Sequence, residues 1–378
     1  MRTLVISDLH LGVRSRAEAL TRPAALSVLL DRLADVDRLV LLGDTLELRH
    51  GPTRDGLATA EPVLRAIGGA LGRGREIVLV PGNHDHAIAA GWLDWRGRRE
   101  EPAALGLEER VGAGRASWIA KHLAAFLAPA DVEIAYPGLW LRDDVYATHG
   151  HYADVHLLVP TLERLAAGAM ARLVGAIPDP ATPDDYESVL APMYALSQAS
   201  AQRGAAGRAA IGSRSAVGAW SALSGRGRSS RIGSRALAVP FRLGVMLANR
   251  AGLGPVEAGV SPADLRRGGL LAATEVARRL RLAPAHLVFG HTHRTGRLVH
   301  DRSSEWRTPG GTQLHNAGCW VFDPLFVGRG PQGSSPYWPG GAIVVDDEGP
   351  PRLERLLGDA PAKVLQGRPD QRPTAARA

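Results

Sequence analysis

Residues 4–10, Leu-Val-Ile-Ser-Asp-Leu-His, join a short apolar run to an Asp-x-His pair. The run Leu4–Ile6 is typical of a strand buried in a sheet. Asp8 and His10 come directly after it, so a tight turn at the strand end can direct both side chains inward. This arrangement of a buried strand followed at once by polar side chains recurs along the chain, and it predicts an α/β fold.

Four further polar clusters also follow apolar runs. They are Gly43-Asp44-Thr45-Leu46-Glu47, Gly82-Asn83-His84-Asp85, His149-Gly150-His151 and Gly290-His291-Thr292-His293. Taken alone, each has an ordinary explanation, such as a turn, a helix cap or a hydrogen-bonded surface histidine. However, six of the 13 histidines lie in the five clusters. Because ligands gather outside the carboxyl ends of strands in open α/β sheets, we expect the clusters to converge in one crevice.

The rest of the chain fits the same fold class. Leucines at helical spacing after Pro23 predict a helix, and the Asp143-Asp144 pair predicts the turn of a hairpin. Strands are expected both before and after a long central segment, so we predict one α/β core that is interrupted in sequence but continuous in space. The expected strands, besides residues 4–6, include residues 39–42, 77–80, 140–141, 145–147, 287–289, 313–314 and 342–345.

The central segment is predicted to be a mainly helical insert. Leu162, Leu165, Met170 and Leu173 fit one face of a helix. Leu265, Leu270, Val276 and Leu280 fit a second, and such stripes are more typical of packing than of ligand binding. The predicted division is a core of residues 1–151 and 276–358, an insert of residues 152–275, and a disordered Pro/Arg/Ala-rich tail of residues 359–378.

Charge is concentrated in the insert. The chain has a formal net charge of +7, yet residues 189–256 contain nine arginines and no acidic residue. Ser, Gly and Ala around residues 203–235 favour a mobile basic loop or frayed helices. The basic residues next to the apolar stretch 243–247 favour a lid or a peripheral contact with an anionic membrane surface, and a solvated basic loop is the alternative. Because only two of the 45 basic residues are lysines, the bias also fits a GC-rich genome, so total basicity identifies no partner.

Other features narrow the class of protein. The single cysteine, Cys319, excludes an intrachain disulfide framework and a cysteine-built zinc site. No run of about 18 apolar residues is present, so a membrane-spanning helix is not expected. The N-terminus enters a strand at once, which leaves no room for a signal sequence, and we expect a cytoplasmic protein, with peripheral membrane contact as an option.

The five clusters together offer two aspartates, one amide oxygen and four histidines as metal ligands. This set is too rich in nitrogen for Ca²⁺ or Mg²⁺ and suits Mn²⁺, Fe or Zn²⁺. About seven ligands are more than one ion needs, whereas two ions sharing a bridging carboxylate would each keep an open position. Two such ions generate hydroxide at neutral pH and hold a phosphoryl group for in-line attack. No serine or cysteine nucleophile is evident.

The five clusters, in their order along the chain, resemble the signature motifs of the calcineurin-like metallophosphoesterases. The resemblance implies a four-layer α/β/β/α sandwich with a dinuclear centre, which we expect to hold Mn²⁺, with Fe or Zn²⁺ as alternatives. It also implies that His84 donates a proton or hydrogen bond to the leaving oxygen while Asp85 orients it. The implied ligands are Asp8, His10 and His293 for the first ion, Asp44 as the bridge, and Asn83, His149 and His291 for the second.

The Asp-Leu-His-Leu start, the His-Gly-His cluster and Gly-His-Thr-His-Arg also resemble the bacterial UDP-2,3-diacylglucosamine pyrophosphatases. Those enzymes place a helical insert before the last motif, where it binds acyl chains. This sequence departs from them at His84, where many carry Arg, and at Thr295, where Pro is usual. We therefore expect cleavage of a phosphoester or pyrophosphate bond in a phosphorylated small-molecule or lipid-linked substrate. The candidate substrate-binding residues are Arg294, His151 and Asn316.

Two other functions compete with this prediction. A nuclease or nucleic-acid phosphodiesterase would use the arginine-rich segment to follow a phosphate backbone. Only three aromatic residues, Tyr194, Trp220 and Phe241, accompany those arginines, which is few for stacking bases. A non-catalytic scaffold of the same fold is disfavoured, because all of the implied ligands are present.

Overall fold

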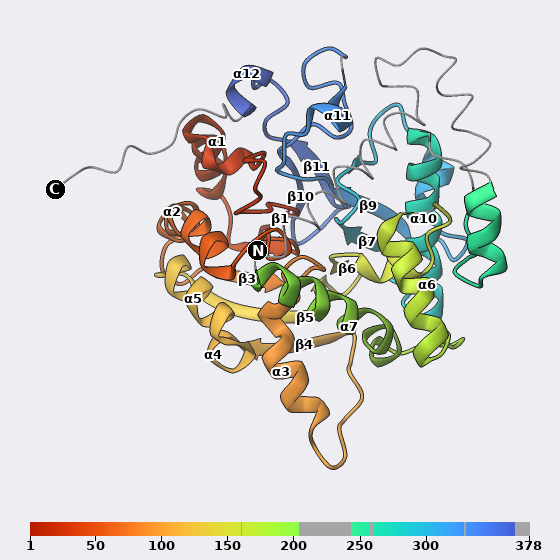
Figure 1. The fold of residues 1–378 in the computed structure, drawn as a ribbon. Helices are drawn as coiled ribbons and strands as arrows, with labels where there is room; N and C mark the ends of the chain where they lie inside the picture. The colour runs from red at the N-terminus through yellow and green to blue at the C-terminus, as the bar shows by residue number, and fades with distance from the viewer. Residues whose placement is uncertain (160, 204–242, 258–260, 329, 367–378) are drawn as a thin grey trace.

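The computed structural model describes residues 1–159, 161–203, 243–257, 261–328 and 330–366, in which strands and helices alternate (Figure 1). The strands are β1 (Thr3–Ile6), β2 (Arg38–Leu42), β3 (Glu76–Val80), β4 (Glu108–Gly112), β5 (Asp131–Arg142), β6 (Val145–Thr148), β7 (His286–Phe289), β8 (Thr295–Gly296), β9 (Gln313–Ala317), β10 (Gly341–Val345) and β11 (Arg352–Arg355). The α-helices are α1 (Pro23–Leu33), α2 (Thr53–Leu71), α3 (Ala87–Gly97), α4 (Ala113–Ala116), α5 (Trp118–Leu127), α6 (Leu162–Val174), α7 (Pro183–Gln202), α10 (Pro262–Arg279), α11 (Pro324–Val327) and α12 (Ala362–Leu365). The 3₁₀ helices are η1 (Ala19–Thr21), η2 (His151–Val155) and η3 (Ser303–Trp306). The strands expected from apolar runs lie within these strands, so those predictions are confirmed.

Local sequence signals fix several of these boundaries. Helix α1 begins at Pro23, as predicted, because proline lacks the N–H that a first helical position leaves unpaired. Helix α5 begins after Ser117, whose hydroxyl oxygen accepts a hydrogen bond from the Ala120 amide at 3.1 Å. Helix α10 begins with a reciprocal pair in which Ser261 and Asp264 cap each other's backbone amides. The predicted hairpin between β5 and β6 also forms, with its turn after Arg142.

The strands follow the order β11-β10-β1-β2-β3-β5-β6-β7-β9-β8, and β4 adds to β5. Strands β1, β2 and β3 pair in parallel. Strand β5 has twelve residues and belongs to both halves of this arrangement. Its first part pairs in parallel with β3, while its second part pairs antiparallel with β6. Strands β6, β7 and β9 then continue in parallel, so β5 joins two sheets into one path.

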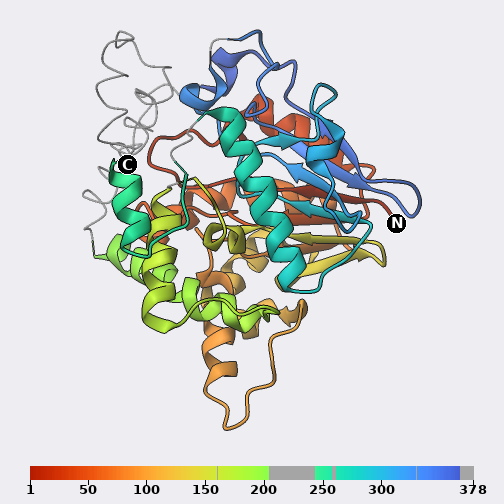
Figure 2. The same ribbon diagram turned by 90° about the vertical axis from the view of Figure 1, so that its right-hand side faces the viewer.

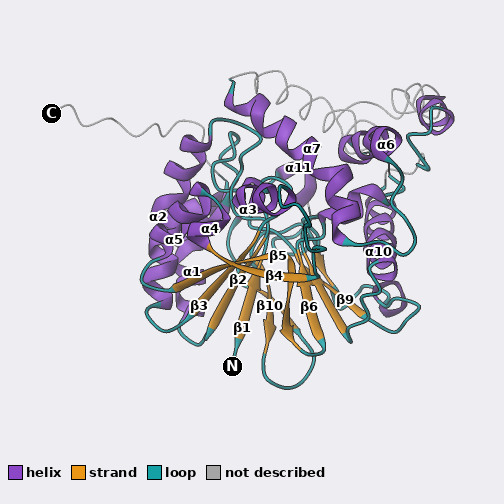
Figure 3. Ribbon diagram, turned by 90° about the horizontal axis from the view of Figure 1, so that it is seen from below, coloured by secondary structure: helices purple, strands orange, loops and turns teal. Residues whose placement is uncertain are grey.

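The two halves pack face to face between helices. Because side chains alternate along a strand, Leu4 and Ile6 of β1 pack with the helices α1, α2 and α5, while Val5 points the other way. Val5 lies in a second core with Val145 and Val288, which come from the other half. Helix α10 covers the outer face of that half. The layers are therefore helix, sheet, sheet and helix (Figure 3), and the predicted four-layer sandwich is confirmed.

The segment between β6 and β7 contains η2, α6, α7, a helical stretch at residues 243–250, and α10. Figure 2 shows α10, in teal, running across the sheets beside the green helices α6 and α7. The predicted insert boundary at residue 275 falls inside α10. This single helix packs on the sheet through Leu270 and Ala277 and on the α6–α7 cluster through Ala272 and Val276, so it cannot be divided there. The expected mobile basic loop, residues 203–235, lies almost wholly outside the described residues.

The chain after residue 358 differs from the expected disordered tail. Helix α12 forms at residues 362–365, and Leu365 is fully buried in the main core against the first half of the sheet. Burial of Leu365 thus orders this part of the tail. The prediction of disorder rested on the overall Pro/Arg/Ala composition and did not consider this single leucine. Residues 367–378 lie outside the described part. None of the described helices combines the length and the apolar character needed to span a membrane.

Candidate metal centre

The predicted polar clusters lie at the carboxyl ends of five strands. Asp8 and His10 follow β1, Asp44 follows β2, and the Asn83–Asp85 stretch follows β3. His149 follows β6, and the pair of histidines at 291 and 293 follows β7. The structure brings these loops together at the edge where the two sheets meet, with ligand atoms close enough to share an ion. The predicted convergence in one crevice is therefore present in the geometry.

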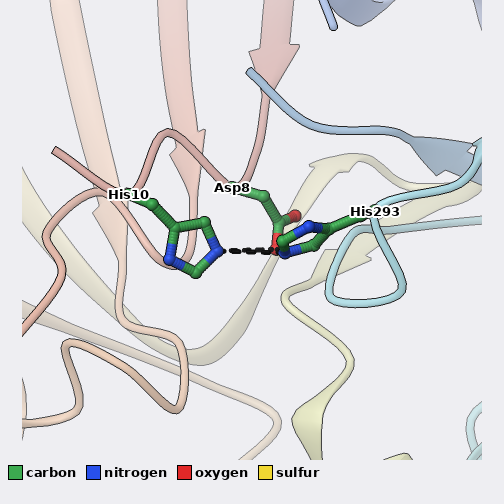
Figure 4. A group of neighbouring side chains, drawn as sticks. All are labelled: Asp8, His10 and His293. Carbon is green, nitrogen blue, oxygen red and sulfur yellow. Dashed lines mark hydrogen bonds and ion pairs between the residues drawn. The ribbon is translucent and has the colours of Figure 1, made fainter. Parts of the chain in front are cut away.

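Asp8, His10 and His293 form a first cluster, in which one ligand atom from each residue lies within 4.8 Å of the others. Figure 4 shows the two imidazole rings facing each other beside the Asp8 carboxylate. The Nε2 atoms of His10 and His293 are 3.0 Å apart. His293 Nε2 is also 3.2 Å from Asp8 Oδ1. Two imidazole nitrogens and one carboxylate oxygen are a ligand set suited to Mn²⁺, Fe or Zn²⁺.

Asp44, His149 and His291 form a second cluster by the same criterion. The Asn83 amide lies next to it, since one end of that amide is 3.2 Å from His149 Nε2, His291 Nδ1 and Asp44 Oδ2, and Oδ1 at that end would act as the ligand. His149 is held by its other nitrogen, Nδ1, which is 2.9 Å from the carbonyl oxygen of Leu42. Four potential ligand atoms therefore surround one point.

Asp44 lies between the two clusters. Its Oδ2 atom is 3.6 Å from His10 Nε2 in the first cluster and 3.4 Å from His149 Nε2 in the second. The side chain is buried, with 1% of the residue exposed. A single carboxylate thus faces both groups of imidazoles, which is the position that a bridging ligand requires.

The backbone at the centre adopts an uncommon conformation. Five of the seven implied ligands have positive φ angles: Asp8 at 57°, His10 at 46°, Asp44 at 51°, His291 at 63° and His293 at 56°. This left-handed region is unfavourable for residues other than glycine, and such strain concentrates at functional sites.

Two motif glycines allow the close packing of these loops. A Cβ atom on Gly290 would lie 2.5 Å from Asp8 Oδ2, and one on Gly82 would lie 2.3 Å from Asp44 Oδ1. The Cβ atom of any residue other than glycine at these two positions would overlap the carboxylate of Asp44 or Asp8. The glycines therefore allow both ligands to reach their positions.

The charges of the two clusters compensate one another. Burial would raise the pKa of the Asp8 carboxyl, but His293 and His149 lower it to about 2, and the pKa of Asp44 also lies well below its usual value. Burial would lower the pKa of His10 and His149, yet the neighbouring carboxylates raise them to about 9 and about 10. Asp8 Oδ1 is buried, has no well-oriented hydrogen-bond donor among the described residues, and lies 3.2 Å from His293 Nε2. Buried carboxylates that hold protons on imidazoles, together with an oxygen that lacks a well-oriented donor, fit a site where cations replace those protons.

His84 forms a third group with His10 and Asp44 by the same 4.8 Å criterion, and it has a carboxylate partner other than the predicted one. Its Nδ1 is 2.8 Å from Glu47 Oε2, and Glu47 is 3% exposed. The prediction that Asp85 orients His84 is wrong, because the Asp85 carboxylate accepts hydrogen bonds from the backbone amides of Gly82 and Leu46. Asp85 therefore ties together the loops after β2 and β3, and Glu47 orients His84.

The three predicted substrate-binding residues have different positions. Asn316 lines the cavity and donates hydrogen bonds to the Gly290 carbonyl and the Thr292 hydroxyl. Arg294 also lines the cavity, but Asp301 binds both ends of its guanidinium group. His151 is 1% exposed, lies within hydrogen-bond distance of the Tyr136 hydroxyl, and is not part of the cavity wall. It lies behind the centre rather than facing it.

Several residues near the centre were not identified from the sequence. Arg49 Nη1 is 3.3 Å from His84 Nε2, and its Nη2 is 3.5 Å from a carboxylate oxygen of Glu163 in α6. Asp154 Oδ1 is 2.7 Å from His291 Nε2. Glu47 belongs to one of the five polar clusters, and Arg49 follows it by two residues. Their position in or next to a cluster could therefore have identified both from the sequence. Nothing in the local sequence distinguishes Asp154 or Glu163.

A cavity of about 330 Å³ opens beside the second cluster. Asp44, His84 and His291 line its polar side. Much of the remaining wall is apolar and comes from α10, the stretch before α6, and aromatic residues at the end of β7 and beyond it. These residues are Leu157, Val159, Leu265, Leu270, Phe289, Trp306 and Phe326.

Comparison with known proteins supports this geometry. Residues 1–170 match the family model described as calcineurin-like phosphoesterase. The matched region includes the first four polar clusters and ends before the fifth, which contains His291 and His293. A search of curated proteins found no match. The family match and the His/Asp clusters together support a metal-dependent phosphoesterase, and the resemblance to the UDP-2,3-diacylglucosamine pyrophosphatases stays a prediction.

Proposed function

We propose that this protein hydrolyses a phosphoester or pyrophosphate bond at a dinuclear metal centre. The position of Asp44 Oδ2, within 3.6 Å of an imidazole nitrogen in each cluster, carries the proposal. A carboxylate shared in this way supports two adjacent ions better than one ion with unused ligands. The first ion would be held by Asp8, His10 and His293, the second by Asn83, His149 and His291, and Asp44 would bridge them.

Two divalent ions would supply hydroxide at neutral pH and would offset the negative charge of a phosphoryl group. The histidine-rich ligand set favours Mn²⁺, with Fe or Zn²⁺ as alternatives. The protein must then orient the substrate and provide a proton for the leaving oxygen.

His84 is suited to provide that proton. Burial alone would raise the pKa of Glu47, but His84 and His10 hold it well below its usual value, so Glu47 is a carboxylate that can only accept. It therefore accepts the hydrogen on His84 Nδ1, and Nε2 faces the Arg49 side of the site. Because a guanidinium can only donate, Nε2 accepts from Arg49 Nη1 in this structure. Nε2 would have to take up a proton and leave Arg49 before it could donate to the leaving oxygen, and Glu47 would stabilise the protonated ring.

Arg49 is the better candidate to bind a phosphoryl oxygen. Its side chain is 20% exposed and lies next to His84. Burial would lower its pKa, but Glu163 and Glu47 raise it, so the group is cationic. Arg294, in contrast, already makes two hydrogen bonds to Asp301, and its guanidinium lies 5.3 Å from the centre of the Trp306 ring. A fork-shaped cation that is partly exposed and close to the proton donor matches phosphate geometry.

The cavity supports a phosphorylated small-molecule or lipid-linked substrate with an apolar portion. Its volume of about 330 Å³ and its largely apolar wall would enclose such a group next to the second cluster. A nuclease is the alternative, motivated by the nine arginines of residues 189–256. The described cavity favours the first, because its volume of about 330 Å³ suits a small molecule or one apolar group, whereas a nucleic-acid strand would need an extended cationic groove.

Contact with an anionic membrane surface is a further part of this proposal. Leu243, Met246 and Leu247 lie on one face of the helical residues 243–250 and are 51%, 44% and 55% exposed. The neighbouring sequence is rich in arginine, which would pair with acidic lipids. Sedimentation with phosphatidylglycerol vesicles, absent with phosphatidylcholine vesicles and reduced by Leu247→Asp, is the expected result; equal sedimentation with both lipids or with neither would contradict it.

Hydrolysis assays of the metal-loaded chain test the proposed activity. After treatment with a chelator and reloading with Mn²⁺, the protein should hydrolyse p-nitrophenyl phosphate, its bis ester or a member of a UDP-sugar panel. Longer apolar groups on the ester should lower KM, because they would fill the cavity. Failure on all of these substrates with Mn²⁺, Fe and Zn²⁺ would contradict the proposal, and cleavage of single-stranded DNA alone would favour the nuclease.

A further inference from the structure

We infer that Asp154 is a positioning residue for the second metal, an inference that rests on the proposed function. Asp154 belongs to η2, at the start of the segment between β6 and β7, and is 2% exposed. Its Oδ1 atom lies 2.7 Å from His291 Nε2. Since a carboxylate can only accept a hydrogen bond, Nε2 carries the hydrogen and Nδ1 keeps its lone pair.

That lone pair faces the second cluster. His291 Nδ1 lies 3.2 Å from the same end of the Asn83 amide that faces Asp44 Oδ2 and His149 Nε2. Asp154 therefore selects the tautomer of His291 that can bind an ion there, and it fixes the plane of the ring. A carboxylate in this position also raises the basicity of the bound imidazole.

The chain delivers Asp154 through a short local connection. His149 is a second-cluster ligand, and Gly150 follows with a φ of 103°, which turns the chain into η2. Asp154 follows within the same 3₁₀ helix. The six residues 149–154 thus supply both His149, the ligand that follows β6, and Asp154, which orients His291, a ligand that follows β7. The other carboxylate oxygen of Asp154 is buried and has no hydrogen-bond partner among the residues that the structure describes.

The other ligand histidines obtain their partners elsewhere. His10 Nδ1 is 3.4 Å from Glu47 Oε2, and His149 Nδ1 is 2.9 Å from the Leu42 carbonyl oxygen. Both partners come from the β2 strand and its loop. Asp154 acts on His291 alone among the ligand histidines with described partners, so its loss should weaken the second site and spare the first.

Mn²⁺ binding to the chelator-treated full-length chain, measured by isothermal titration calorimetry, tests this inference without any activity assay. Asp154→Ala should weaken one of two Mn²⁺ sites by about 10- to 100-fold and leave the other unchanged. Asp154→Asn keeps an oxygen that can accept from Nε2, so it should weaken that site less. Asp94→Ala is the control, because it removes an exposed acidic side chain of α3 that is not part of the cavity wall, and both of its Mn²⁺ affinities should equal those of the wild type.

The outcomes separate the inference from the proposed function. Wild-type affinities for both ions in Asp154→Ala would overturn the role of Asp154 and leave the dinuclear centre standing. Equal weakening of both sites in Asp154→Ala would also overturn it. Fewer than two Mn²⁺ ions bound by the wild-type chain would contradict the dinuclear centre itself. If Asp154→Ala fails to fold, as judged by circular dichroism, Asp154→Asn decides: unchanged affinities would overturn the inference, and weakening of one site would support it.

Discussion

Two regions of the molecule contribute to the centre in different ways. The loops at the strand ends supply all seven implied metal ligands and His84, whereas the segment between β6 and β7 supplies carboxylates that bind to these loops. Asp154 contacts His291, and Glu163 lies 3.5 Å from Arg49. Glu187, on α7, lies 2.9 Å from the ring of His86, which follows the β3 cluster.

The difference shows what each region must do. The strand-end loops hold ligands in strained left-handed conformations, which needs a rigid sheet and glycines beside the carboxylates. In the described part of the segment between β6 and β7, three carboxylates lie next to imidazole or guanidinium groups of these loops, where they can orient those side chains; they belong to Asp154, Glu163 and Glu187. The described part of this segment thus contributes side chains next to the ligands as well as part of the cavity wall. Substitutions in the two regions should therefore fail in different ways.

The largest effect is expected at the carboxylate that both clusters share. Asp44→Asn keeps the size of the side chain and removes the charge that faces His10 and His149. Bound Mn²⁺ should fall, measured by elemental analysis, and hydrolysis should fall to the level of the metal-free chain. Asp94→Asn, at an exposed position on α3, should change neither. If Asp44→Asn kept two bound ions and its activity, Asp44 would not be a bridging ligand.

Replacing the proton donor should separate chemistry from metal binding. His84→Ala is expected to lower kcat by about 10²- to 10⁴-fold, the usual contribution of a general acid, while Mn²⁺ content stays at the wild-type level. Steady-state kinetics and elemental analysis measure the two effects. His122→Ala, an exposed histidine of α5, is the control. Loss of metal from His84→Ala would show that this residue is a ligand instead.

The contact between Arg49 and Glu163 connects the two regions directly. Arg49→Ala should reduce kcat/KM by about 10- to 100-fold, mainly through KM, because a charged hydrogen bond contributes about 1.5–3 kcal/mol. Arg49→Lys should recover part of the loss, and Glu163→Gln should have a smaller effect because it only orients the guanidinium. Arg54→Ala, whose side chain is 86% exposed, is the control. An unchanged KM for Arg49→Ala would contradict a phosphate contact.

The smallest effect concerns stability in the loop after β1. Glu18 is 3% exposed, and burial raises its pKa to about 7. The folded state therefore holds more protons than the unfolded state between about pH 4.5 and 7, and this group lowers stability as the pH rises through that window. One pKa unit corresponds to 1.36 kcal/mol, so ionisation of Glu18 can lower the free energy of unfolding by at most about 3 kcal/mol.

Urea unfolding of the metal-free chain at pH 5 and pH 8 measures this effect. Glu18→Gln cannot ionise, so its stability relative to the wild type should be greater at pH 8 than at pH 5. Other titrating groups cancel in the difference between the two proteins. A difference that does not change with pH would contradict a raised pKa for the buried Glu18 carboxyl.

The same division of the molecule explains what the sequence could predict. An interrupted α/β core and the convergence of the five polar clusters followed from local signals, namely apolar runs and the polar residues directly after them. The four-layer arrangement and the assignment of the seven ligands came instead from the resemblance to the calcineurin-like metallophosphoesterases. The roles of Glu47 and Asp154 did not follow, because their partners lie 37 and 137 residues away in the chain. His151 was misplaced for a related reason: local spacing does not tell which side of a loop faces the cavity.

A stepwise titration of the chelator-treated chain with Mn²⁺ tests whether hydrolysis requires two bound ions. Bound metal and hydrolysis of bis-p-nitrophenyl phosphate, or of the best substrate found, are followed together. For a dinuclear centre, activity should rise with the second equivalent, reach its plateau at two ions per chain, and be absent from Asp44→Asn throughout. Full activity at one ion per chain, or no hydrolysis with two ions bound, would contradict a catalytic dinuclear centre.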